Sequence, residues 1–137
     1  RALEIYENQG LSPDDLRYGA LYNNFATTLS NVSRFDEALE YYLMAIENTS
    51  AQPTALLDTA ISYINLAELY ERKDGLESDK IEIYLKMAEE ILNSDKVKQD
   101  SYYAFVCEKT APDFDYYGYF FFANELKERA RKIYEGN

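Results

Sequence analysis

The sequence predicts an all-α fold in which antiparallel helix pairs stack into an α-α superhelix (solenoid) of about three repeats, preceded by a partial N-terminal helix. Apolar residues recur at i, i+3, i+4 and i+7, the spacing of one helix face. Helix breakers are few, with five Gly and three Pro in 137 residues. A regular period is also present, since Ala2, Ala45, Ala88 and Ala130 are 43, 43 and 42 residues apart.

The first helix pair is predicted to run from about residue 13 to 31 and from about residue 34 to 48. Ser12 is expected to cap its first helix, with Pro13 at the first helical position. Ser33 is expected to cap the second helix, because two acidic residues follow in its first turn. The residues that share the apolar faces of this pair are Tyr22, Phe25, Ala26, Leu29, Ala38, Tyr42 and Ala45.

The second pair is predicted from Pro53 to about Arg72 and from a Ser78 cap to about Leu92, with Gly75 in the connection. Its apolar faces repeat the spacing of the first pair, through Tyr63, Leu66, Ala67, Tyr70, Ile81, Leu85 and Ala88.

The third pair departs from this pattern. Ser94 or Asp95 is expected to cap its first helix, and Pro112 to stop that helix near Lys109. A longer insertion would then precede a last helix over residues 114–134, with Gly118 as a weak point. Ala123 and Ala130 are expected to form the apolar face of this last helix.

The order of residue types in Tyr22–Leu29 and Ala38–Ala45 resembles the tetratricopeptide repeat (TPR). A period of about 42 residues exceeds the usual 34 and is similar to the longer variety found in kinesin light chains and many bacterial scaffolds. The resemblance implies a non-enzymatic scaffold that binds a protein partner. Armadillo or HEAT repeats, which have a similar period, are the structural alternative.

Composition restricts the class of partner and the compartment. A net charge of −11 argues against nucleic acid and disfavours anionic membranes. A single Cys forms no internal disulfide, which together with the lack of a signal-like apolar run favours the cytoplasm. The first residue is not Met and Ala2 is already in repeat register, so residues 1–137 are expected to form one repeat domain of a longer chain.

Catalytic chemistry is not expected. The chain has no His, which excludes imidazole acid-base catalysis and histidine metal sites. Cys107 lacks a base to activate it and is interpreted as a buried structural thiol. Asp113 and Asp115 are interpreted as capping residues at a helix start. The sequence therefore predicts no enzyme, no cofactor and no metal site.

Residues opposite the apolar face of each first helix are expected to line the concave groove of the superhelix. Small and polar side chains give way to aromatic ones along this groove. The predicted positions are Ala20, Asn24, Thr27 and Asn31 in the first repeat, Ile61, Asn65, Glu68 and Arg72 in the second, and Lys98, Tyr102, Phe105 and Lys109 in the third.

Asn24 and Asn65 are the principal candidates for peptide binding. They lie 41 residues apart, and each precedes a large apolar residue and then Ala. A carboxamide donates and accepts hydrogen bonds, so these side chains could pair with the backbone of an extended peptide. Kinesin-light-chain-like repeats use asparagines at matching places in this way, and the resemblance implies the same role here. Ordinary solvated polar residues are the alternative.

Two further function classes stay open. The aromatic run that includes Tyr116, Tyr119 and Phe120 would either fill the gap left by the insertion or form a homo-oligomer contact. The chain could also be the regulatory arm of a larger enzyme, given its expected truncation.

Overall fold

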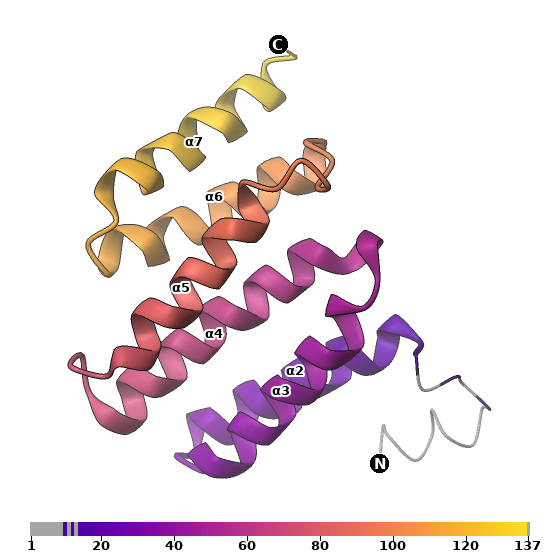
Figure 1. Cartoon of the computed structure of the whole chain (residues 1–137), viewed down its shortest axis with the longest axis vertical. Helices are drawn as coiled ribbons and strands as arrows, with labels where there is room; N and C mark the ends of the chain where they lie inside the picture. The colour runs from indigo at the N-terminus through magenta and orange to yellow at the C-terminus, as the bar shows by residue number, and fades with distance from the viewer. Residues whose placement is uncertain (1–9, 11, 13, 137) are drawn as a thin grey trace.

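The computed structural model describes residues 10, 12 and 14–136, and its regular elements are all helical. The predicted partial helix at residues 1–8 lies outside these residues. The elements are α2 (Leu16–Asn31), α3 (Phe35–Ser50), the 3₁₀ turn η1 (Pro53–Ala55), α4 (Leu56–Asp74), α5 (Asp79–Leu92), α6 (Ser101–Tyr116) and α7 (Phe120–Tyr134) (Figure 1).

The helices form three successive antiparallel pairs, as predicted. α2 packs on α3, α4 on α5 and α6 on α7, and the pairs follow one another along the long axis (Figure 1). The first helices of neighbouring pairs also touch, α2 with α4 and α4 with α6. The side that α2, α4 and α6 present away from their partner helices is called the groove face below.

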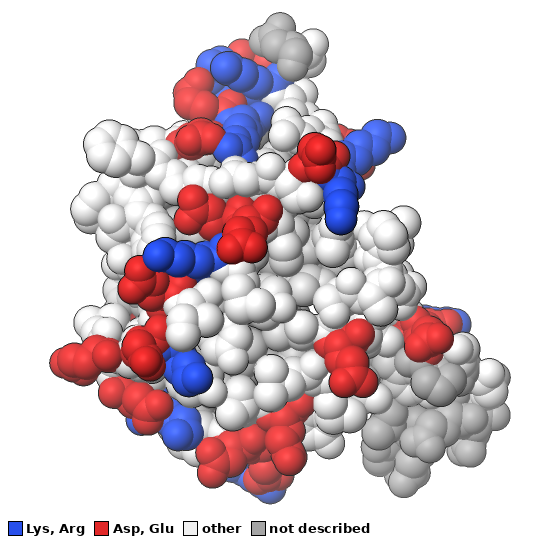
Figure 2. Space-filling model, in the orientation of Figure 1, with Lys and Arg blue, Asp and Glu red and all other residues white. Residues whose placement is uncertain are grey.

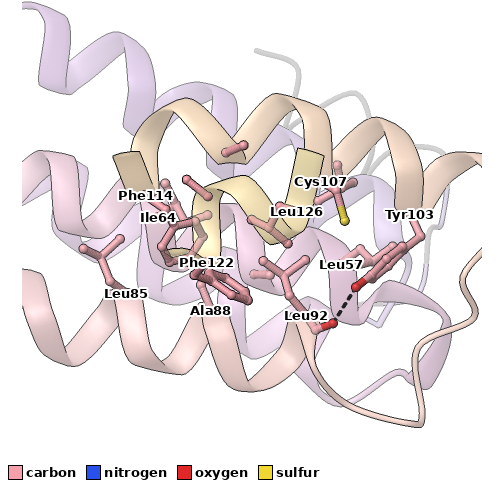
Figure 3. Close-up of a cluster of buried hydrophobic side chains, with 14 of the residues drawn as sticks. Leu57, Ile64, Leu85, Ala88, Leu92, Tyr103, Cys107, Phe114, Phe122 and Leu126 are labelled. Atoms are coloured by element: carbon pink, nitrogen blue, oxygen red, sulfur yellow. Dashed lines mark hydrogen bonds between the residues drawn. The ribbon is translucent and has the colours of Figure 1, made fainter. Parts of the chain in front are cut away.

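Buried alanines let the paired helices approach each other, while larger side chains fill the core. Ala26, Ala38, Ala67, Ala88, Ala104 and Ala123 have no exposed surface. The larger of two core clusters joins α4, α5, α6 and α7 (Figure 3). In it the hydroxyl of Tyr103 donates to the Leu92 carbonyl oxygen at 2.7 Å, which ties α6 to the end of α5 (Figure 3).

Of the three helix caps predicted in the first two pairs, two are wrong and one is confirmed. Asp15, rather than Ser12, caps α2 by accepting a hydrogen bond from the Arg17 amide. Ser33 adopts a φ of 65° in the turn, so Arg34 precedes α3 without a side-chain cap. Ser78 caps α5 as predicted, with its hydroxyl oxygen accepting from the Lys80 amide.

The third pair begins later than predicted. Asp100 caps α6 by accepting from the Tyr103 amide at 3.0 Å. Ser94 and Asp95 therefore lie in the connection after α5, and Lys98 is not on a helix. Val97 of this connection is buried in the larger core cluster, which explains why the segment packs closely without being helical.

Pro112 does not end its helix. It lies on the exposed side of α6, between the buried Ala111 and the half-buried Asp113, and the helix continues to Tyr116. Packing of buried Ala111 and Phe114 stabilises the turn that the proline weakens. The chain reverses instead at Gly118, whose φ of 93° favours glycine.

The expected long insertion before the last helix is therefore absent, and the single helix predicted over residues 114–134 is divided between α6 and α7. Ala123 and Ala130 form part of the buried face of α7, as predicted.

Candidate functional site

A hollow of about 230 Å³ lies on the groove face between α2 and α4. Each of the two helices forms one side of the hollow, because α2 and α4 run side by side as the first helices of neighbouring repeats. Its lining consists of Leu16, Gly19, Ala20, Asn23, Asn24, Thr49, Asp58, Ile61 and Ser62.

The structure places Asn24 in this hollow but gives Asn65 a different neighbour. Asn24 is exposed. Asn65 is half-buried and donates through Nδ2 to Oδ1 of Asn23, at 3.3 Å. The Ser62 hydroxyl donates to the same oxygen, also at 3.3 Å. Asn23 thus links the two repeats, and its separation of 42 residues from Asn65, one repeat period, is the signal that could have identified it.

Thr27 and Asn31 are both hydrogen-bonded within the molecule. The Thr27 hydroxyl lies 3.0 Å from the Tyr42 hydroxyl of α3, which directs it toward the partner helix. Oδ1 of Asn31 accepts from Nη1 of Arg72 at 3.1 Å. Arg72 therefore connects the C-terminal ends of α2 and α4 across the groove face.

Glu68 and Asp113 form a carboxyl pair between α4 and α6. Burial, together with a hydrogen bond with Asp113, raises the pKa of Glu68 to about 7. Burial also raises the pKa of Asp113. The hydrogen bond between them raises the pKa of Glu68 and lowers that of Asp113, so Glu68 holds the proton that the pair shares. Asp113 was expected to cap a helix, but it lies inside α6 and faces Glu68.

Tyr102 and Phe105 form an exposed aromatic pair on α6. Their rings stack with centroids 6.3 Å apart, and they are 44% and 51% exposed. The Tyr102 hydroxyl donates to Oδ1 of Asp58 at 2.6 Å. Burial and this carboxylate raise the pKa of Tyr102. Asp58 was not predicted, although it precedes Ile61 by three residues and so continues the same stripe of α4.

A second carboxylate of α4 holds the end of α6. Oε2 and Oε1 of Glu71 accept hydrogen bonds from the hydroxyls of Tyr116 and Tyr117, both at 2.7 Å. Beyond the turn, the half-buried Tyr119 packs edge-on against Phe114. Phe120 is 60% exposed. Of the three residues predicted for a contact between copies, Tyr116 and Phe120 are exposed, whereas Tyr119 belongs partly to the core.

The opposite face of the molecule carries mixed charges. Figure 2 shows acidic side chains spread over it, with basic ones among them over α7 at the top. Arg129 pairs there with Glu125, and Arg131 pairs with Glu128 and Glu135. The pairs of Arg131 are exposed, as is typical of a solvated surface, whereas Arg129 is partly buried and also donates to the Tyr103 hydroxyl at 2.9 Å.

Other kinds of site find little support within the described residues. Cys107 is buried in α6, and burial raises the pKa of its thiol. Residues 10, 12 and 14–136 contain no group of three or more His, Cys, Asp or Glu that could hold a metal ion. No helix in the same part of the chain has the length and apolar character needed to cross a membrane.

Stacked antiparallel pairs whose first helices share one face define a TPR-like helical repeat fold. The crystal structure of BtubC (BKLC) from P. vanneervenii is similar, with a TM-score of 0.58 and 22% sequence identity. The match covers 98% of this chain and 53% of that one, so the chain spans about half the length of that protein. Comparisons with protein-family models and with curated proteins give no match. The predicted fold is thereby confirmed, whereas the longer repeat variety stays a prediction.

Proposed function

We propose that this chain is a non-enzymatic interaction scaffold that binds a peptide or a helix of a protein partner on its groove face. The observation that carries the proposal is the hollow between α2 and α4, with the exposed Asn24 on its lining. TPR-like folds are commonly protein-interaction modules, which supports the class of function. The single Cys supports a cytoplasmic location.

The groove face offers different contacts along its length. Asn24 provides a carboxamide that can pair with a peptide backbone, and Asn65 contributes the part of its amide that does not bond Asn23. The stacked Tyr102 and Phe105 provide apolar area farther along the face. Glu68 and Arg72 lie farther toward the C-terminal end of α4, where they would contact a longer bound segment.

A peptide display library provides the test of this function. Peptides selected on the parent chain should bind the Asn24→Ala, Asn65→Ala double variant about thirtyfold more weakly, because two backbone contacts are lost at about 1 kcal/mol each. An Asn124→Ala variant, which changes an exposed residue of α7, should bind like the parent. Equal binding by all three proteins would contradict the assignment of the groove face.

Self-association is a second candidate, favoured by the exposed aromatic side chains on both sides of the turn at Gly118. Phe121 is 93% exposed, beside Phe120, and Tyr116 is 62% exposed. Burial of such rings is a strong driving force for association. If this patch joins two copies, sedimentation velocity at high protein concentration should show a dimer that a Phe120→Ser, Phe121→Ser variant converts to monomer. A parent chain that sediments as a monomer at every concentration would exclude this candidate.

A further inference from the structure

We propose that the hollow between α2 and α4 receives a basic side chain of the bound peptide, a lysine or an arginine, with Asp58 as its counter-ion. This inference rests on the proposed function, because it names the class of peptide that the groove face would bind.

The lining of the hollow fits a long side chain with a charged end. Of the described residues that line it, Asp58 is the only charged one. Leu16 and Ile61 offer apolar surface for an aliphatic stem, and Asn23 and Asn24 offer amide groups near it. Lysine and arginine place their methylene groups on apolar surface and keep the charged end among polar groups.

The geometry around Asp58 leaves a carboxylate oxygen for a ligand. Asp58 is half-buried, and its Oδ1 accepts the Tyr102 hydroxyl at 2.6 Å. Its Oδ2 has no hydrogen bond or ion pair with any residue that the structure describes. The Tyr102 hydroxyl is a neutral donor, so it orients the carboxylate without neutralising its charge.

Nearby charges also favour a cation over an anion in the hollow. Lys96 and Lys98 line a different hollow, which Tyr102 also borders. The net charge of −11 adds a general attraction for basic segments.

The same contacts predict how the peptide continues. Tyr102 holds Asp58 with its hydroxyl, and its ring stacks on Phe105 at the surface. An apolar or second basic residue of the peptide would reach this aromatic pair, since rings of this kind attract both apolar groups and cations.

The test uses a random nonapeptide display library, panned separately against the parent chain and an Asp58→Lys variant. Peptides from the parent should share a lysine or arginine at one position, and those from Asp58→Lys should carry an acidic residue there instead. For a parent-selected peptide, replacing that basic residue by norleucine should weaken binding to the parent about tenfold, since a charge-assisted hydrogen bond is lost. The norleucine peptide leaves the protein unaltered, so this readout stands even if a protein variant fails to fold.

The Asp58→Asn substitution should weaken binding of the same peptide to a similar extent. Circular dichroism should show that this variant keeps the helix content of the parent. The matched control is Asp79→Asn, which removes a carboxylate from the first turn of α5 and should bind like the parent. Selected peptides that are neutral or acidic at every position, or that bind Asp58→Asn as well as the parent, would overturn this inference but not the proposed function. Failure to select any peptide would overturn both.

Discussion

Replacing Phe114 by Ala should lower the free energy of unfolding by about 3–5 kcal/mol, the largest effect expected of any single change in the third repeat. Phe114 has no exposed surface, and its ring meets that of Phe122 edge-on with centroids 4.8 Å apart. Truncation would leave a cavity where α6 and α7 join the main core cluster (Figure 3). Native proteins are stable by only about 5–15 kcal/mol, so α6 and α7 should unfold first.

Urea denaturation followed by circular dichroism measures this effect. The matched control is Phe121→Ala, since the same side chain is removed from a position that is 93% exposed. That variant should change the free energy of unfolding by less than about 0.5 kcal/mol. If the two variants were equally stable, the placement of Phe114 in the core would be wrong.

The second large effect is that the free energy of unfolding should depend on pH, because Glu68 titrates in the folded chain. Burial raises its pKa from 4.5 to about 7 in the folded chain. Between these values the folded state binds more protons than the unfolded state, so stability is full below about pH 4.5 and falls as the pH rises to 7. The carboxyl group is partly exposed, and with solvent screening we expect a loss of about 1–2 kcal/mol.

A Glu68→Gln variant removes this titration. Gln keeps the shape of the side chain and a donor toward Asp113 but cannot ionise, so the variant should exceed the parent in stability by about 1–2 kcal/mol at pH 8 and match it at pH 4.5. The measurement is urea denaturation at both pH values. Glu40→Gln, on the exposed side of α3, controls for the loss of one charge from an acidic chain. A constant difference between Glu68→Gln and the parent across this range would refute the shared proton.

The fold could be predicted because its signals are local and repeated. The alanines of the second helices recur at one position per repeat, and Ala45, Ala88 and Ala130 are buried where that period requires. Helix periodicity needs only the spacing along the chain, which is why three pairs and most of their apolar faces were predictable. Ser78 likewise combines a capping residue with the start of an apolar pattern, so the start of α5 was predictable.

The errors in the third repeat have a tertiary origin. Pro112 weakens a helix in isolation, but burial of Ala111 and Phe114 on either side stabilises α6 through it. The cap of α6 was expected at Ser94 or Asp95, and Asp100 was missed because its role as a cap depends on where the chain leaves the core at Val97. Packing against other helices determines both the continuation of α6 through Pro112 and the position of its cap. A local sequence pattern does not contain these tertiary contacts.

The candidate site was predicted in outline only. Spacing placed Asn24 and Tyr102 on the groove face, because a helix face follows from 100° per residue. Contacts between repeats could not be obtained in this way. The bond of Asn65 to Asn23, that of Tyr102 to Asp58 and the Glu68–Asp113 pair each depend on how neighbouring helices are shifted along their axes.

The central claim is that a peptide binds on the groove face between α2 and α4. It is tested most directly by titrating the ¹⁵N-labelled chain with a library-selected peptide and following the side-chain amide signals of the asparagines by NMR. We predict shifts at Asn24 and Asn65, and none at Asn124 on the exposed surface of α7. Shifts confined to α7 and the turn before it would contradict the claim and place the interaction on the exposed phenylalanines.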